Sequence, residues 1–269
     1  MSLNILDLFG IKGRVAVVTG GSSGIGLMVA KVIPSLSDTP DQAKVALPTD
    51  PIDETVSELN LLGSASSGGS AQGYACDLSS KSAIAELASY ISKAEGGKLD
   101  ILISNAGIRR DRRSSVIVNT TAHYFLCVAL LPLLAAAADQ EIDGGRSRGA
   151  EQGRGVMVIT SSCASMHNAT NVDLTSYASS KAATDHLVKL LAAKFPRYSR
   201  QIVPSRMNPV GAEVSMFAGL FDKLPAKRAG REEDLAGTLL YLVSKAGAYV
   251  NGISLCVDGG RVLVANGQE

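Results

Sequence analysis

The chain has 269 residues, of which 46% are hydrophobic and 19% charged, and its formal net charge is +1 at pH 7. This length and composition allow one large core, so we expect residues 1–269 to form a single domain. The near-zero net charge excludes a strongly basic surface for nucleic acid or for an anionic membrane.

Alternating strands and helices are predicted along the chain. Strands are expected at 14–19, 44–48, 72–75, 99–104, 155–160, 200–205 and 253–257, and helices at 24–33, 51–62, 80–94, 119–138, 175–193 and 231–243. This alternation predicts an α/β fold, a Rossmann-type three-layer sandwich with a doubly wound parallel sheet, and a ligand outside the carboxyl ends of the strands.

Three segments rich in Gly, Ser or charge interrupt the pattern, at 63–73, 139–155 and 206–230. The first two are expected to be solvated loops. The longest apolar run, 125–138, has 14 residues and contains Pro132. It is too short to cross a membrane and predicts a buried helix.

The cysteines indicate a reducing compartment. Cys76, Cys127, Cys163 and Cys256 are far apart, without a Cys-x-x-Cys spacing or a local His, so we expect core thiols of a cytoplasmic protein and no metal site. The N-terminal residues lack a charged leader before an apolar stretch, so no secretory signal is expected.

A glycine-rich turn follows the first predicted strand. Gly20, Ser22, Ser23, Gly24, Ile25 and Gly26 lie between the apolar run Arg14 to Thr19 and an apolar-periodic helix. Glycine lets the backbone turn tightly and approach a phosphate, and the free N–H groups of a new helix face that anion. Strand, glycine turn and helix together predict a dinucleotide site.

Tyr177 and Lys181 are four residues apart in Tyr-Ala-Ser-Ser-Lys, which puts them on one face of a helix. An ammonium beside a phenol favours the phenolate and lowers the phenol's pKa from about 10. The pair therefore predicts a general acid for a developing alkoxide. The alternative is an ordinary surface helix with an amphipathic Tyr and Lys.

With these motifs the chain resembles the short-chain dehydrogenase/reductases from residue 14 to residue 260. Thr19 to Gly26 resembles the family's TGxxxGxG loop, and Ser104-Asn105-Ala106-Gly107 its NNAG strand end. The C-terminal Val257-Asp258-Gly259-Gly260 is also similar. The resemblance implies cofactor contacts from Asp77, Leu78, Asn105, Ala106, Gly107, Tyr177 and Lys181.

The same resemblance implies hydride transfer from a reduced nicotinamide with Asn119, Ser162, Tyr177 and Lys181 as the catalytic set. Tyr177 donates the proton, Ser162 binds the substrate oxygen, and Lys181 lowers the tyrosine pKa and binds ribose. Asn119 holds a backbone carbonyl and a water. Ser161 is the alternative to Ser162, whose 15-residue spacing to Tyr177 is nearer the family's usual value.

The cofactor preference receives opposing signals. Asp50 follows the second strand where NADP-preferring relatives place Arg, so it repels a 2′-phosphate. Resemblance to biosynthetic reductases favours NADP(H), which we expect over NAD(H). In the loop after the sixth strand, Pro209 and Val210 are expected near the nicotinamide, and either Val214 or Ser215 falls at the position of the family's amide-binding hydroxyl.

Two loops depart from the family and predict the substrate contacts. The charged segment after Gly107 contains Arg109, Arg110 and Asp111, and either is a solvated loop or widens the pocket. Glu213, in the expected substrate lid 206–230, is a solvated acid or stabilises a cationic substrate such as an iminium. Cys163 is either core or a substrate contact.

Three functions remain open from the sequence. The first is an NAD(P)H-dependent reductase of a carbonyl or imine in a biosynthetic, secondary-metabolite intermediate, resembling reductases of ketoacyl or fungal alkaloid type. The second is a cyclase or Diels–Alder-type enzyme on the same fold, and the third a non-catalytic binding relative. We expect a small-molecule substrate and a homodimer or homotetramer through the helices 119–138 and 175–193.

Overall fold

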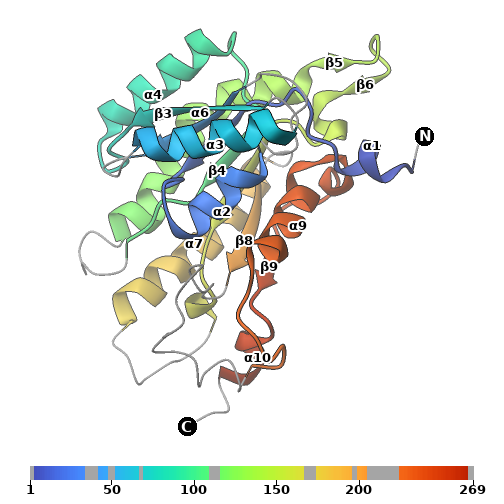
Figure 1. Ribbon diagram of the computed structural model, residues 1–269. Coiled ribbons are helices and arrows are strands. Elements are labelled where there is room, and N and C mark those ends of the chain that lie inside the picture. The colour runs from blue at the N-terminus through green and yellow to red at the C-terminus, as the bar shows by residue number, and fades with distance from the viewer. Residues whose placement is uncertain are drawn as a thin grey trace.

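The computed structural model describes residues 3–33, 42–47, 52–66, 69–108, 116–166, 174–195, 199–204 and 224–265. Among these, seven parallel strands form one sheet in the order β3-β2-β1-β4-β7-β8-β9 (Figure 1). Their bounds are β1 Ala16–Thr19, β2 Gln42–Leu47, β3 Ser70–Ala75, β4 Ile101–Ser104, β7 Val156–Thr160, β8 Ser199–Pro204 and β9 Ser254–Val257. The predicted doubly wound sheet is confirmed.

The strand order reverses beside β1, because the chain runs outward to β2 and β3 and then returns to β4 on the other side. Ala16 of β1 is in register with both Ala43 of β2 and Ile101 of β4, and Ile101 is in turn in register with Val156 of β7. In sheets of this kind the crevice at such a reversal is where ligands bind.

Helices pack on both faces of the sheet. They are α2 Gly24–Val32, α3 Ile52–Ser66, α4 Lys81–Ala94, α6 Ala122–Asp139, α7 Thr175–Lys194 and α9 Glu232–Val243, with the short α1 Ile5–Phe9 and α10 Arg261–Ala265 at the ends. A π-helical turn, η2 Ile117–Thr121, leads directly into α6. Strands β1, β4 and β7 are buried on both faces, as their uninterrupted apolar sequences predict.

Consecutive residues of a central strand pack into two separate cores, one on each face of the sheet. Val18 packs with the buried residues of α2 and α9, whereas its neighbour Val17 packs with those of α4, α6 and α7. This alternation follows from the two-residue period of a strand. The carboxyl ends of the central strands are thereby held between two packed layers.

Three expectations are corrected by the structure. Segment 139–155 is not a plain loop but contains the hairpin β5 Glu141–Ile142 and β6 Ser147–Arg148 and a 3₁₀ turn, Gly149–Gln152. In segment 63–73, α3 continues to Ser66 and β3 starts at Ser70. Cys256 is exposed, while Cys76, Cys127 and Cys163 are buried as predicted.

The apolar central helix is longer than its sequence run indicated. The continuous helical segment Ile117–Asp139 has 23 residues, and its most apolar 18-residue window has a mean hydropathy of 1.8. The helix is therefore long and apolar enough to cross a membrane, and the expectation that it is too short was wrong. Half of its most apolar stretch is buried inside the protein. Leu126, Leu130 and Leu134 are fully buried, which makes this a core helix.

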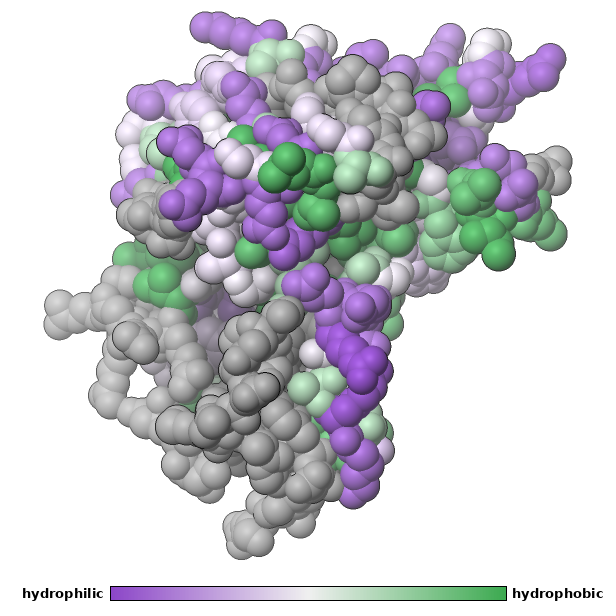
Figure 2. All heavy atoms as spheres, in the orientation of Figure 1, coloured by the Kyte–Doolittle hydropathy of each residue, from purple (hydrophilic) through white to green (hydrophobic). Residues whose placement is uncertain are grey.

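Apolar side chains on α1 and just before it are exposed. Leu3, Ile5 and Leu6 at the N-terminus are 72–83% exposed. Figure 2 shows hydrophobic atoms at the end of the molecule where α1 lies in Figure 1.

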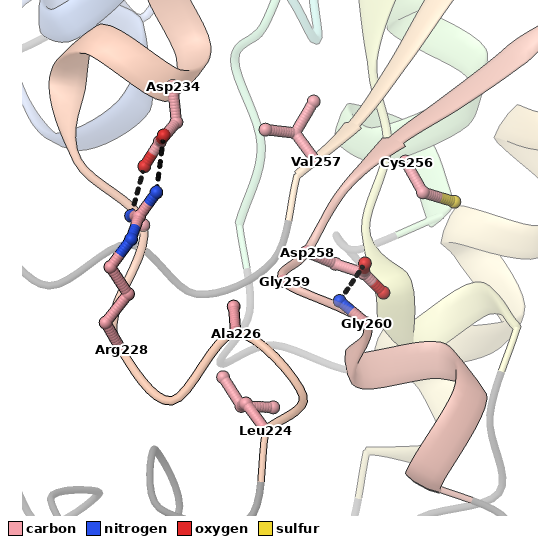
Figure 3. A pocket seen from close by; sticks show the side chains of 10 residues that line it. Leu224, Ala226, Arg228, Asp234, Cys256, Val257, Asp258, Gly259 and Gly260 are labelled. Carbon is pink, nitrogen blue, oxygen red and sulfur yellow. Dashed lines mark hydrogen bonds and ion pairs between the residues drawn. The ribbon is translucent and has the colours of Figure 1, made fainter.

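The chain turns sharply after β9. Asp258 accepts hydrogen bonds from Gly260 N at 2.9 Å and Val262 N at 2.8 Å, which fixes the start of α10. Gly259 and Gly260 have φ of 61° and 85°, a conformation that glycine adopts without strain. Figure 3 shows this turn at the side of a cavity of about 300 Å³, which Cys256 also lines.

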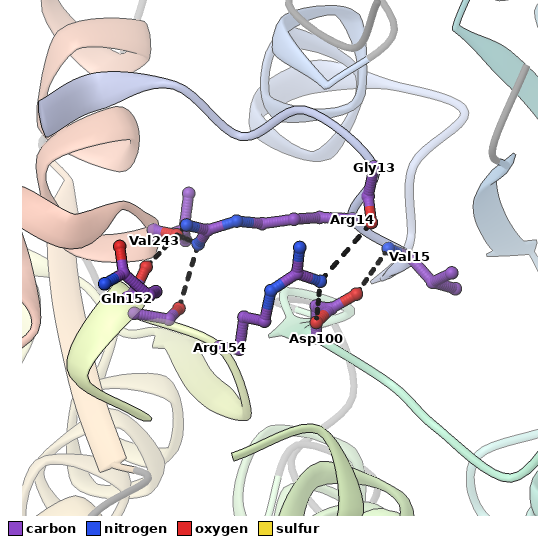
Figure 4. A network of polar contacts seen from close by, with 8 residues as sticks. Gly13, Arg14, Val15, Asp100, Gln152, Arg154 and Val243 are labelled. Carbon is purple, nitrogen blue, oxygen red and sulfur yellow. Dashed lines mark hydrogen bonds and ion pairs between the residues drawn. The ribbon is translucent and has the colours of Figure 1, made fainter. Parts of the chain in front are cut away.

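Charged side chains tie together the amino ends of the strands (Figure 4). The Arg14 guanidinium is buried and donates to the carbonyls of Gly153, Val243 and Gln152 at 3.0, 2.5 and 2.5 Å. Nearby, Asp100 accepts from Arg154 Nη1 at 2.7 Å and from Val15 N at 2.9 Å. These bonds join the start of β1 to the segments before β4 and β7.

Asp100→Asn is expected to lower the free energy of unfolding by about 2 kcal/mol, because an amide replaces the charge and one of the two acceptor oxygens. Urea unfolding measures this. Glu141→Gln is the control, since its ion pair with Arg148 is exposed and spans 3.3 Å, and it is expected to change stability by less than about 0.5 kcal/mol. Equal losses in the two variants would contradict the prediction.

Candidate active site

The glycine turn after β1 leaves an open cradle at the start of α2. Gly20 and Gly24 have φ of 63° and 53°, and a Cβ on Gly24 would meet no atom within 4 Å. Ser23 precedes the helix without a side-chain bond to it, so the first helical N–H groups stay available to a ligand. This geometry fits a dinucleotide phosphate.

The ends of β1 and β4 are joined by side-chain hydrogen bonds. Thr19 Oγ1 accepts from the backbone N–H groups of Asn105 and Ala106 at 2.9 and 3.0 Å. Asn105 Nδ2 in return donates to Thr19 O at 3.1 Å. Gly26 lies against this junction, and a Cβ there would be 1.9 Å from Gly20 O. The close packing holds the cradle beside the end of β4.

Asn119 is fully buried in the π-helical turn. Its Oδ1 accepts from Ile108 N at 2.8 Å, and its Nδ2 donates to Ile108 O at 2.9 Å and to Ser180 Oγ at 3.0 Å. Asn119 is expected to hold a backbone carbonyl and a water, and its side chain bonds the carbonyl of Ile108. Its own backbone carbonyl accepts from Thr184 Oγ1 at 2.6 Å. A carbonyl has two lone pairs, so one acceptor position is used within the protein.

Tyr177 and Lys181 line the same cavity from α7, as their spacing predicted. Lys181 is 3% exposed, and its Nζ donates to Thr160 O at 2.9 Å at the end of β7. Burial lowers the pKa of Lys181 to about 8, and the negative charge of Asp185 opposes that shift. Lys181 is therefore expected to lose its proton near pH 8.

Reduction is expected to be constant well below pH 8 and to fall as the pH rises through about 8, because neutral Lys181 no longer assists Tyr177. A kcat profile from about pH 6 to 10 measures this, and a flat profile through pH 8 would contradict the role assigned to Lys181.

The pKa of Lys181 in the folded protein lies below the ordinary 10.5, so the unfolded chain binds more protons between these two values. This lysine's contribution to stability consequently rises with pH across that window.

The two serines after β7 make different hydrogen bonds. Ser161 Oγ contacts Lys181 O at 3.2 Å and Asp185 Oδ1, so its proton already has two acceptors. Ser162 Oγ accepts from Ala164 N at 3.2 Å, which leaves its own proton for an outside acceptor. Ser161 rather than Ser162 is in the cavity wall, but the hydrogen bonds favour Ser162 as the donor to a substrate oxygen.

These elements enclose a cavity of about 550 Å³ at the carboxyl ends of β1, β4 and β7. Most of the predicted cofactor residues line it, namely Gly20, Ser22, Ser23, Ile25, Gly26, Asp77, Leu78, Asn105, Ala106, Gly107, Tyr177 and Lys181. The described residues of the wall do not include Gly24, Asn119, Ser162 or Cys163. Asp50, Arg109, Arg110, Asp111, Pro209, Val210 and Glu213 lie outside the described residues.

Asp77 is turned toward its own loop. Its Oδ1 accepts from the hydroxyl and the N–H of Ser79 at 2.7 and 2.8 Å, and these bonds lower the pKa of Asp77. The carboxylate stays charged at the edge of the cavity. Ser79 belongs to the wall as well, although the sequence did not single it out.

Sequence reasoning also missed polar residues behind the site. Ser104 Oγ and His123 Nδ1 are 2.6 Å apart, and burial lowers the pKa of His123 to about 3, so the imidazole is neutral. From α7, Ser180 and Thr184 bond to Asn119, and Asp185 contacts Ser161 beside the catalytic serine. The available signal was the polar stripe that these residues form with Lys181 on the packed face of the helix.

A family model described as short chain dehydrogenase matches residues 14–224. The chain belongs to the short-chain dehydrogenase/reductase family. It is 31% identical over 306 residues to the short-chain dehydrogenase/reductase PhomF of Diaporthe leptostromiformis, covering 98% of this chain and 96% of the relative.

Two solved structures of the family are similar over nearly their whole length. The RhlG/NADP complex of Pseudomonas aeruginosa has a TM-score of 0.78 at 26% identity, over 94% of this chain and 97% of that one. A 7α-hydroxysteroid dehydrogenase with NADH and 7-oxo glycochenodeoxycholic acid also has a TM-score of 0.78, at 25% identity, over 96% and 98%. This short-chain dehydrogenase/reductase is an NAD(P)-dependent oxidoreductase.

Proposed function

We propose that this enzyme reduces a carbonyl or an imine/iminium group of a biosynthetic, secondary-metabolite intermediate. The observation that carries the proposal is the position of Tyr177 and the buried Lys181 in the same cavity as the glycine cradle. An acid beside the dinucleotide site protonates the oxygen or nitrogen that becomes electron-rich as the neighbouring carbon is reduced.

The cradle and the catalytic helix would hold the two ends of one cofactor. Gly20, Ser22 and the first N–H groups of α2 would bind the phosphates, and Lys181 the nicotinamide ribose; their position in one cavity wall supports this. A reduced nicotinamide supplies hydride when bound there. The residues of the chain would bind and orient it, because the space beside Gly24 is open and a Cβ there would meet no atom within 4 Å.

The protein's own groups manage the proton. Tyr177 donates it to the developing alkoxide, and the Ser162 hydroxyl donates a hydrogen bond to the same oxygen. The Lys181 ammonium lines the same cavity and favours negative charge that develops there. Asn119 fixes this arrangement through Ser180 Oγ, which also donates to Tyr177 O at 2.7 Å.

We expect NADP(H) to be preferred over NAD(H). The RhlG structure is a complex with NADP and the hydroxysteroid dehydrogenase structure one with NADH, so relatives of this fold bind either form. The discriminating Asp50 is outside the described residues. A parallel titration with NADPH and NADH, followed by cofactor emission and melting temperature, decides the preference, and the chain has no Trp to interfere.

The reductase proposal is tested by mixing the enzyme with NADPH and a panel of ketones and cyclic imines, followed by mass spectrometry of the products. A mass gain of two hydrogens with matching NADPH oxidation supports reduction. An isomer of unchanged mass without NADPH oxidation would support the cyclase alternative. Binding of neither cofactor would contradict the proposal and favour a binding relative.

We further propose a cytoplasmic homodimer or homotetramer formed through α6 and α7. The exposed apolar side chains Tyr124, Val128 and Leu190, at 39–55% exposure, support a contact through these helices. Sedimentation at several protein concentrations measures the oligomeric state. A monomer at micromolar concentration would contradict this.

A further inference from the structure

A carboxylate that none of the assigned roles uses lies directly behind the catalytic residues. Asp185 is on α7 one turn after Lys181, and it is only partly exposed. Both of its oxygens contact serine hydroxyls: Oδ1 meets Ser161 Oγ and Oδ2 meets Ser165 Oγ at 2.5 Å. Asp185 therefore bridges the two ends of the turn that follows β7.

This turn carries Ser162. The residues Cys163–Ser165 form a 3₁₀ turn that Ser162 begins, with Ser162 Oγ accepting from Ala164 N. Ser165 Oγ lies 2.7 Å from Ser162 O, so one hydroxyl contacts both the carboxylate and the backbone of the catalytic serine. Holding Ser161 and Ser165 fixes the three-residue turn between them, and with it the direction of the Ser162 hydroxyl.

Asp185 also acts on Lys181 through its charge. Burial removes water from the ammonium and lowers the lysine pKa, while the nearby carboxylate favours the charged form. The backbone carbonyl of Lys181 lies 3.2 Å from Ser161 Oγ, so the same serine connects the acid to the lysine's turn of the helix.

We propose that Asp185 is a positioning residue of the reductase site, which aims Ser162 through the Ser161 and Ser165 hydroxyls and keeps Lys181 protonated near neutral pH. This inference rests on the proposed function. Asp185 acts through Ser162 and Lys181 and is not itself in the described wall of the cavity.

The titratable groups facing the Lys181 and Asp185 pair in the described part of the chain are few. Tyr177 is on the same helix, and His123 comes from α6 and stays neutral above a pKa of about 3. Cys163 lies in the turn, and Cys256 of β9 has its pKa raised, first by burial and then by Asp258 and Asp185. A loss of activity near pH 8 is accordingly assigned to the Lys181 and Tyr177 pair, and the effect of Asp185 on it to the charge beside Lys181.

The test compares kcat from about pH 6 to 9.5 in the wild type, Asp185→Asn, Asp185→Ala and Ser165→Ala. Asparagine keeps two polar atoms for the serines but removes the charge. The alkaline fall is expected to move down by about one pH unit, which lowers kcat roughly five-fold at pH 8 and little at pH 6. Asp185→Ala is expected to lower kcat at pH 6 as well, by about 10-fold, because Ser162 is no longer held.

Ser165→Ala is the matched variant that loses one tether and keeps the charge, so it is expected to lower kcat without moving the alkaline fall. Glu54→Gln, an exposed acid on α3, controls for the net charge and is expected to match the wild type. If the Asp185→Asn profile coincided with that of the wild type, the charge role would be wrong. An Asp185→Ala enzyme with wild-type kcat at pH 6 would overturn the positioning role.

A second readout does not require turnover. The Kd of NADPH, measured from its emission over the same pH range, is expected to rise as Lys181 loses its proton, and to do so about one pH unit lower in Asp185→Asn. If the wild type binds NADPH but reduces no substrate, the proposed function fails while this shift still decides the role of Asp185. Coincident binding profiles would overturn the inference even in an active reductase.

Discussion

Tyr177→Phe is expected to lower the rate of reduction by at least about 10²-fold, which is the usual size of a general acid–base contribution. The substitution removes the proton donor and keeps the ring in the cavity wall. Lys181 and its bond to Thr160 O are untouched, so the Kd of NADPH is expected to stay within about three-fold of the wild-type value. Single-turnover rates with saturating NADPH, together with an emission titration, separate these two quantities.

Tyr249→Phe provides the control for losing a phenol, because Tyr249 is fully exposed. Its rate is expected to equal that of the wild type. The result with Tyr177→Phe also discriminates between substrates. A carbonyl that is reduced to an alcohol needs a proton, whereas an iminium becomes a neutral amine by accepting hydride alone. Turnover that survives Tyr177→Phe nearly unchanged would exclude carbonyl reduction through Tyr177.

Gly26→Ala is expected to abolish measurable NADPH binding and to lower the free energy of unfolding by about 3 kcal/mol or more. The added Cβ would be 1.9 Å from Gly20 O and 2.5 Å from Asn105 Nδ2. Gly20 belongs to the cradle and Asn105 joins it to β4, so neither atom can move without opening the cofactor site. Urea unfolding and the shift in melting temperature on adding NADPH give the two effects.

A Gly→Ala substitution in another helix separates the steric clash from the effect of helix propensity. Gly237 lies within α9, and a Cβ there would meet no atom within 4 Å. Gly237→Ala is therefore expected to raise stability by about 0.5–1 kcal/mol and to leave NADPH binding unchanged. Similar behaviour of the two alanine variants would show that the cradle does not depend on the close packing at Gly26.

The strands and most helices of the fold could be predicted because their signals are local. Strand β4 reads Ile-Leu-Ile and is buried on both faces, and α7 has the Tyr177 and Lys181 spacing within its own sequence. The hairpin at 141–148 could not be predicted in the same way. Its residues are rich in Gly and charge, and the segment is fixed by packing against α6. Gly149, directly after the hairpin, lies so close to α6 that a Cβ on it would be 2.0 Å from Ala137 O.

The candidate site likewise has parts that local motifs predicted and parts that only the fold brings together. The glycine cradle and the end of β4 are short motifs, so the sequence located them and the cavity contains both. Ser161 and Asp185 are 24 residues apart, and Ser104 and His123 are 19 apart, so only the folded chain brings each pair together. The choice of Ser162 over Ser161 rests on spacing and stays a prediction: the hydrogen bonds of the turn favour Ser162, whereas Ser161 lines the cavity.

The strand order has a consequence for how the enzyme is made. By the time Ser104 has left the ribosome, the chain already contains β3, β2, β1 and β4, which are four neighbouring strands of the sheet. Asn119, Ser162, Tyr177 and Lys181 are all synthesised later. Until β7 arrives, the apolar strand β4 is the open edge of a half-built sheet and a site for pairing with another nascent chain. We therefore expect the exposed edge of β4 to be open to chaperones while residues 104 to 160 are being synthesised, before the catalytic half of the protein exists.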